Sequence, residues 1–172
     1  MKPLEEPMGM YTAYHRHTVN RAIHYVMVPA IVWSLMVALD LVPLFVLGGT
    51  TITLAFPIVA LLLIWYLMLD FTFGVASAAV FTMLLVSAIV LNVSVASPTT
   101  SLIIAGCVFV GSWVFQFLGH GVWEKRRPAL VDNVLQVLIA PMFLVAETAF
   151  AMGFKKDLEQ RIEAVAKTHA KA

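Results

Sequence analysis

The stretch SWVFQFLGHGVWEKRRP, residues 112–128, decides how the rest of the chain is read. It begins as apolar, membrane-type sequence, carries Gln116, His120 and Glu124 at intervals of four residues, and ends in a basic cluster. Four residues advance only about 40° around an α-helix, so the three polar side chains share one stripe. Because ionisable side chains are costly inside a membrane unless they have partners, the stripe predicts a functional site where a helix meets water.

The composition indicates an integral membrane protein. Of the 172 residues, 61% are hydrophobic and only 12% are charged, and the mean hydropathy is +0.91. Soluble domains contain about a quarter charged residues. The formal net charge is +1, and no basic face alternates with aromatic residues, so the sequence gives no sign of nucleic-acid binding. The length fits a single membrane domain over residues 1–172.

The placement of the positive charges predicts the orientation in the membrane. All 11 lysines and arginines lie at positions 2–21 or 125–171, and the cluster that ends the opening stretch consists of Lys125, Arg126 and Arg127. The positive-inside rule then places both chain ends in the cytoplasm, so the chain crosses an even number of times, in either the bacterial inner membrane or the endoplasmic reticulum. The single cysteine, Cys107, cannot form an internal disulfide.

Apolar runs and turn signals predict an all-α bundle of four membrane spans. Each run comes close to the ~20 residues that a bilayer requires. The expected spans cover about residues 25–47, 52–69, 71–91 and 102–122.

Two further segments follow the fourth span. Residues 129–154 are apolar but are interrupted by Pro141 and Glu147, and a fifth crossing would place the C-terminal cations on the wrong side. We therefore expect a re-entrant or interfacial segment. Residues 155–171 carry apolar side chains at helical spacing between charges, which predicts a C-terminal amphipathic helix on the surface, with His169 in solvent.

A second group of polar residues occupies positions 14–24, YHRHTVNRAIH. On one straight helix His15 and His24 would be half a turn out of phase and could not face one site. Thr18 is a good N-cap residue, so a new helix beginning there would leave His15 in the preceding turn, free to fold back. The N-terminal segment can therefore present both histidines to one site.

The four-span topology brings this group to the same membrane face as the polar stripe of the fourth span. His15, His24 and His120 can converge there and form a metal site. The additional ligands or supporting polar groups are Asn20, Gln116 and Glu124, with His17 as a competing ligand. Imidazoles with oxygen donors suit Zn, Fe, Ni or Cu, and two or three histidines with a carboxylate suit non-haem Fe(II) and O2 chemistry.

Other interpretations of the same residues stay open at this point. The histidines could bond only to backbone or lipid headgroups, and the basic cluster is typical of the end of a membrane span. A non-catalytic haem- or metal-binding membrane protein could use His24 and His120 as axial ligands. Glu147 and Asp132 could pair with the basic cluster. The chain has no GxSxG elbow, Walker loop or GxGxxG motif.

Two motifs resemble a known family. The first is YH-x4-N-x3-H, which begins at Tyr14, and the second is QF-x-GH-x3-E-x2-RPA-x2-DN-x2-Q-x4-P, which runs from Gln116 to Pro141. They are similar to the motifs of the small membrane 2-hydroxy fatty acid dioxygenases of fungi and bacteria. The fungal members act in the α-oxidation step of phytosphingosine breakdown. The resemblance covers essentially the whole chain, and the second motif is long and unusual.

The resemblance implies an Fe(II)-dependent oxidoreductase that uses O2 to convert a 2-hydroxy fatty acid into the fatty acid one carbon shorter and CO2. It implies metal binding by His15, His24 and His120, and it includes Glu124 in the catalytic set as a ligand or as an orienting group. The chain has His17 where the family varies, and Thr18 where the family often has proline. A cation of the basic cluster, Lys125, Arg126 or Arg127, is expected to hold the substrate carboxylate.

Overall fold

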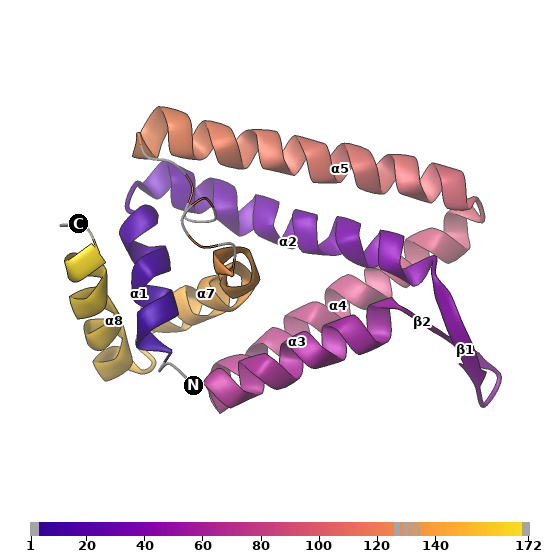
Figure 1. Cartoon of the computed structure of the whole chain (residues 1–172), viewed down its shortest axis with the longest axis horizontal. Coiled ribbons are helices and arrows are strands. Elements are labelled where there is room, and N and C mark those ends of the chain that lie inside the picture. The colour runs from indigo at the N-terminus through magenta and orange to yellow at the C-terminus, as the bar shows by residue number, and fades with distance from the viewer. Residues whose placement is uncertain (1–3, 126–127, 129–130, 132, 134, 170–172) are drawn as a thin grey trace. The chain divides into compact units, whose positions relative to one another are not determined.

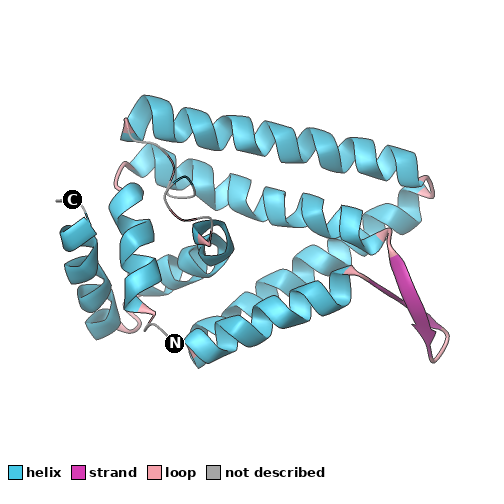
Figure 2. Ribbon diagram, in the orientation of Figure 1, coloured by secondary structure: helices cyan, strands magenta, loops and turns pink. Residues whose placement is uncertain are grey.

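The computed structural model describes residues 4–125, 128, 131, 133 and 135–169. Within these residues the protein is mostly helical, with seven α-helices, one π-helix and one β-hairpin (Figures 1 and 2). The chain forms two compact units: the first contains Met1–Val26 and Phe115–Ala172, and the second contains Met27–Val114. The helices α2 (Thr18–Asp40) and α5 (Pro98–Leu118) contribute residues to both units.

The first unit contains all the residues of the predicted site. It is built from α1 (Glu5–Tyr14), the first turns of α2, the end of α5, the π-helix η1 (Gly119–Glu124), α7 (Gln136–Ala151) and α8 (Lys156–His169). Helix α1 packs against both α7 and α8 (Figure 1).

Helix α8 confirms the predicted C-terminal amphipathic helix, but its apolar side faces protein. Leu158, Ile162 and Ala166 are buried, and α8 lies so close to α1 that a Cβ on Gly9 would lie 2.7 Å from Val165 Cβ. An ion pair joins the same two helices, with Arg161 Nε 3.0 Å from Glu5 Oε1, and His169 Nε2 lies 3.4 Å from Glu6 Oε1. The His169 side chain is 32% exposed, so it keeps contact with solvent, as predicted, while it also lies against Glu6.

Helix α7 occupies most of the segment predicted to be re-entrant or interfacial. It is a regular helix of 16 residues with Pro141 inside it. Its buried residues include Met142, Phe143 and Ala146. The length and hydropathy of α7 place it with the shorter apolar helices of the chain, so its relation to the membrane stays a prediction.

The second unit corrects the all-α prediction and the boundary of the first span. The expected span 25–47 ends at Asp40 as helix α2, and β1 (Pro43–Leu47) pairs antiparallel with β2 (Thr50–Thr53). The two residues between the strands, Gly48 and Gly49, both have positive φ, at 57° and 82°. Two-residue hairpin turns require this backbone conformation, which glycine adopts without a steric penalty.

Asp40 explains why the helix ends where it does. Its carboxylate accepts hydrogen bonds from Thr53 Oγ1 at 3.0 Å and from Asn92 Nδ2 at 2.9 Å. A part-buried carboxylate is stabilised by such donors. The contacts fix the end of α2 against β2 and the last turns of α4 (Phe71–Val95).

Helices α3 (Ala55–Leu69) and α4 form a tight pair within this unit (Figure 1). The Asp70 side chain caps α4 by accepting a hydrogen bond from Phe73 N at 3.0 Å. A Cβ on Gly74 would lie 2.7 Å from the Cα of Leu67, so glycine permits the close approach of the two helices.

Three described helical segments are long and apolar enough to cross a membrane, judged by length and composition: Thr18–Asp40, Phe71–Val95 and Pro98–Glu124. Helix α3, expected as the second of four spans, has only 15 residues. The structure supports three spans by these criteria, and the fourth stays a prediction.

Candidate metal centre

Three histidines from separate segments of the first unit meet in its interior. His15 follows the end of α1, His24 lies in the second turn of α2, and His120 belongs to η1. Their exposed fractions are 4%, 3% and 3%. One ligand nitrogen from each ring can be chosen so that all three lie within 4.8 Å of one another. The structure thus brings together the three residues predicted as metal ligands.

The orientation of two of the rings is set by backbone carbonyls. Nδ1 of His15 is 2.7 Å from the carbonyl oxygen of Tyr11, and Nδ1 of His24 is 2.8 Å from that of Asn20. A carbonyl oxygen only accepts, so both Nδ1 atoms carry the proton and both Nε2 atoms present a lone pair. Metal-binding histidines commonly donate their other ring N–H in this way.

The two Nε2 atoms then face each other at 3.1 Å. Two lone pairs at this distance repel unless a proton or a cation lies with them. A metal ion would satisfy both nitrogens, since neutral imidazole nitrogen is a common ligand of transition metals. The two nitrogens are thus placed where one cation could bind both.

His120 contributes a third nitrogen with no competing partner. Its Nδ1 is buried and makes no hydrogen bond among the described residues. The ring centroid of His120 is 4.8 Å from that of His15 and 5.2 Å from that of His24. Its backbone lies in a π-helix, a rare conformation that occurs frequently at functional sites.

Burial favours the metal-binding form of His15. Desolvation lowers the pKa of this imidazole well below its usual range, and the neighbouring charges of His24, His120 and Arg21 lower it further, although the hydrogen bond to Tyr11 opposes this. The side chain is therefore neutral at physiological pH, and only the neutral imidazole binds a metal. The phenol ring of Tyr11 stacks on His15 with a centroid distance of 3.9 Å and an interplanar angle of 7°.

Glu124 contacts the backbone next to His15 and lies outside the group that could hold a metal. Its Oε1 accepts hydrogen bonds from the backbone N–H groups of Arg16 and His17, the latter at 2.8 Å, and Asn20 Nδ2 lies 3.4 Å away. The carboxylate therefore joins the end of η1 to the turn between α1 and α2. Of the two roles left open for Glu124, these contacts favour the orienting one.

His17 and Thr18 have different roles from those expected. The helix α2 begins at Thr18, and the residue before it, His17, caps it: Nδ1 of His17 accepts a hydrogen bond from Val19 N at 3.2 Å. His17 is exposed, and it is outside the histidine group. The sequence placed the helix start correctly but assigned the cap one residue too late.

The remaining predicted site residues differ in how deeply they are buried. Asn20 is fully buried, with its Oδ1 lacking a hydrogen bond among the described residues, and Gln116 is buried in α5. Lys125 is exposed and ends η1 with a φ of 53°. Arg126 and Arg127 lie outside the described residues, as does Asp132.

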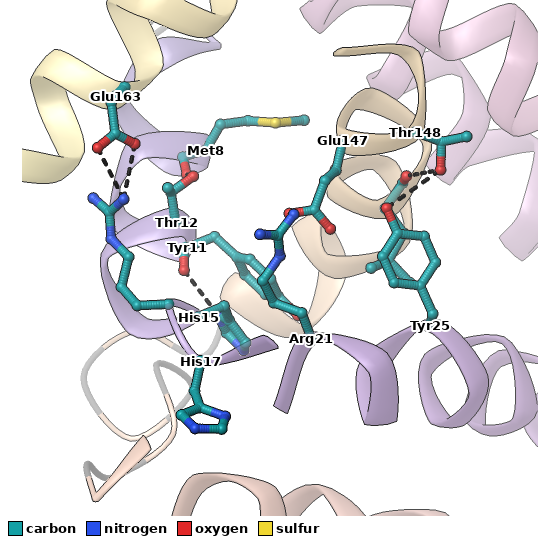
Figure 3. A network of polar contacts seen from close by, with 12 residues as sticks. Met8, Tyr11, Thr12, His15, His17, Arg21, Tyr25, Glu147, Thr148 and Glu163 are labelled. Carbon is teal, nitrogen blue, oxygen red and sulfur yellow. Dashed lines mark hydrogen bonds and ion pairs between the residues drawn. The ribbon is translucent and has the colours of Figure 1, made fainter. Parts of the chain in front are cut away.

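An ion pair near the site was missed. Glu147 of α7 binds Arg21 of α2, with Oε1 2.5 Å from Nη2 (Figure 3). Phe143, one turn earlier on α7, places its ring centroid 6.4 Å from that of His15. Both contacts depend on where α7 packs, and residues 129–154 alone carry no signal for that.

Comparison with known proteins shows which family the chain belongs to. The profile of the family described as "2-hydroxy-palmitic acid dioxygenase Mpo1-like" matches residues 1–152. The chain belongs to the Mpo1-like family. It is 34% identical over 161 residues to the 2-hydroxy-palmitic acid dioxygenase MPO1 of Saccharomyces cerevisiae, which covers 93% of this chain and 87% of the yeast protein. No solved structure matches the chain. The resemblance drawn from the two motifs is therefore confirmed, and the Mpo1-like match includes all three histidines.

Proposed function

We propose that this protein is an Fe(II)-dependent dioxygenase of the membrane that converts 2-hydroxy fatty acids to the fatty acid one carbon shorter. The observation that carries the proposal is the buried trio of His15, His24 and His120, with two ring nitrogens facing each other at 3.1 Å. Membership of the Mpo1-like family and the name of the yeast relative support the substrate class.

The proposed reaction balances with O2 as the only oxidant. A 2-hydroxy acid, R–CH(OH)–COOH, and O2 give R–COOH, CO2 and H2O. The bond between the carboxyl carbon and the carbon bearing the hydroxyl breaks, and the substrate loses four electrons, which O2 accepts. The bound Fe(II) would supply Lewis-acid activation and a template for O2 and the hydroxy acid.

The protein residues have separate tasks in this proposal. His15, His24 and His120 hold the ion through one nitrogen each, and three protein ligands leave positions for other molecules. The carbonyls of Tyr11 and Asn20 keep the Nδ1 protons of two rings in place, so the Nε2 atoms stay unprotonated. Burial of the rings keeps bulk water away from the reacting atoms.

The apolar helices suit a substrate with a long alkyl chain, because such an acid partitions into the bilayer that these helices would occupy. We propose an integral membrane location with both chain ends in the cytoplasm, as the charge distribution predicts. The lipid bilayer, the 2-hydroxy acid and O2 are the expected partners.

Reconstitution tests the proposal. Purified protein is loaded with Fe(II) under anaerobic conditions, and O2 consumption and product mass are then measured with 2-hydroxypalmitic acid. We expect the fifteen-carbon acid, CO2 and equimolar O2 uptake. Removal of iron with a chelator should abolish turnover, and renewed Fe(II) should restore it. Formation of no shortened acid by the iron-loaded protein would contradict the proposal.

His120→Ala is the sharpest variant, since His120 is the one ligand with no hydrogen bond to a backbone carbonyl among the described residues. We expect loss of stoichiometric iron and of turnover, with the helical content retained. The exposed His17→Ala is the matched control and should keep both. Normal iron content and activity in His120→Ala would exclude the trio as the iron site.

The haem alternative fits the geometry less well. Axial histidines lie on opposite faces of a haem, with the macrocycle between them. Here the ring of His15 lies 4.4 Å from that of His24 and 4.8 Å from that of His120, measured between centroids. Three imidazoles gathered in this way favour a single ion. An optical spectrum separates the two, because bound haem gives a Soret band and the proposed centre gives none.

A further inference from the structure

A second polar cluster lies on α2 and α7, next to the histidine trio, and has no task in the proposed function. Its central contact is the ion pair of Arg21 and Glu147, with Nη2 2.5 Å from Oε1. Thr148 donates a hydrogen bond to the Tyr25 hydroxyl at 3.4 Å beside it. Figure 3 shows Arg21 and Glu147 pointing toward one another from the two helices.

The helical spacing places this pair about one turn from the histidines. Arg21 precedes His24 by three residues on α2, and residues at this spacing are neighbours on a helix surface. Glu147 follows Phe143 by four residues on α7, and the Phe143 ring contacts the histidine group through His15 at a centroid distance of 6.4 Å. Both helices thus extend from the trio to the ion pair.

Arg21 is more exposed than Glu147, so the guanidinium is the member of the ion pair that a ligand can reach. The Glu147 side chain is 14% exposed, and its Oε2 is buried without a hydrogen bond among the described residues. The Arg21 side chain is 41% exposed. A guanidinium has five N–H donors in a planar fork, and the contact with Glu147 Oε1 leaves donors for a second carboxylate. Arg21 can therefore bind an incoming anion.

We propose that Arg21 binds the carboxylate of the substrate, and that Glu147 holds the guanidinium in position before the substrate arrives. The identity of the acid rests on the proposed function. In a 2-hydroxy acid the carboxylate adjoins the bond that breaks, so its binding group must lie next to the histidines. A planar arginine fork matches a carboxylate, and such charge-assisted hydrogen bonds are stronger than neutral ones.

Binding to metal-free protein tests this inference without relying on turnover. The full chain in neutral detergent is titrated calorimetrically with 2-hydroxypalmitic acid and with its uncharged methyl ester. Arg21→Gln should weaken binding of the acid about tenfold and leave binding of the ester unchanged. Glu147→Gln should bind the acid at least as tightly as the unaltered protein, since it frees the guanidinium.

Arg161→Gln is the matched control, because it also removes an arginine that pairs with a glutamate, Glu5. It should retain the preference for acid over ester. Lys125→Gln tests the rival cation of the basic cluster in the same assay. Loss of the preference for the acid in Lys125→Gln, with that preference retained in Arg21→Gln, would overturn the inference. Iron stoichiometry and helical content of Arg21→Gln should match those of the unaltered protein, which shows that the histidine centre is intact.

Three further results would overturn the inference. Arg21→Gln could keep the full preference for the acid, or Arg21→Gln and Glu147→Gln could weaken it equally, as expected of a purely structural ion pair. An alkyl phosphate of equal chain length could displace the acid through Arg21 at lower concentration, which would assign the residue to lipid headgroups. If Arg21-dependent acid binding holds and iron-dependent turnover fails, the proposed function falls and the carboxylate site remains.

Discussion

The carboxylate of Glu124 contacts the peptide groups that follow His15. Its hydrogen bonds to the N–H groups of Arg16 and His17 fix the turn in which α1 ends and α2 begins. That turn decides whether His15 folds back toward His24. We therefore treat Glu124 as a positioning residue for His15.

Substitutions at Glu124 separate positioning from ligation. Glu124→Gln keeps an oxygen that can accept both N–H bonds, so we expect it to retain stoichiometric iron. Glu124→Ala leaves those exposed N–H groups to water and should lower the free energy of unfolding by about 1 kcal/mol and weaken iron binding. Iron titration and denaturant unfolding of the two variants measure this. Complete loss of iron in a folded Glu124→Gln protein would instead identify the carboxylate as a ligand.

The lowered pKa of His15 predicts how the metal-free protein responds to acid. The unfolded chain has the higher pKa, about 6.5, and so takes up this proton first as the pH falls. The free energy of unfolding is therefore greatest above about pH 6.5 and declines as the pH falls toward the lower pKa of the folded state. Denaturant unfolding between pH 5 and 8 measures the slope. His15→Gln should have a flatter profile; an unchanged slope would contradict this.

For single residues, the sequence predicted which side chains belong to the site better than it predicted what those side chains contact. The phase conflict between His15 and His24 required a break near Thr18, and the structure has that break. The contacts of Glu124 could not be predicted from the sequence, because they involve backbone N–H groups more than 100 residues earlier in the chain. Backbone partners leave no mark in a sequence pattern.

Among the secondary-structure elements, the π-helix η1 is the one that places His120. It begins at Gly119, where an added Cβ would collide with Asn20 Oδ1 and lie 3.3 Å from Ile23 Cδ1. This close approach brings η1 against the first turns of α2, which carry His24. A glycine is therefore required here by packing, although its backbone is helical.

Two glycines of η1 allow a matched test. Gly119→Ala should push η1 away from α2, lower the free energy of unfolding by about 1–3 kcal/mol and weaken iron binding. Gly121→Ala is the control, because a Cβ there meets nothing within 4 Å. Thermal unfolding and iron titration compare the two variants. Equal effects of both substitutions would show that packing against Asn20 does not matter.

The β-hairpin shows why element types were harder to predict than their locations. The apolar run 41–47 fits a helix or a strand equally well, since short apolar segments do not reveal their period. The observed turn at Gly48 and Gly49 falls in the gap between the expected spans 25–47 and 52–69. The contacts of Asp40 with Thr53 and Asn92 end the helix early, and they depend on tertiary structure. The π-helix was likewise invisible, because no residue pattern distinguishes it from the end of α5.

At the scale of the whole molecule, charge and length disagree about the number of membrane crossings. Among the residues that the structure describes, three helical segments satisfy the length and hydropathy expected of a span, and an odd number would place the chain ends on opposite sides. The positive charges at both ends favour the same side and an even number. The number of crossings depends on whether helix α3 spans the membrane. Its 15 residues would extend about 22 Å, less than the ~30 Å hydrocarbon core.

We predict that α3 does cross, because its residues are almost uniformly apolar and a bilayer can thin locally to match a short helix at modest cost. Single cysteines placed in a Cys107→Ser background report the side of each turn when labelled by a membrane-impermeant thiol reagent in intact cells and inverted vesicles. Positions Phe71, at the start of α4, and Lys156, at the start of α8, should label from the cytoplasm. Leu47, at the hairpin tip, should label from the opposite side. Labelling of position 71 from the same side as position 47 would reduce the crossings to three and place the two chain ends on opposite sides of the membrane.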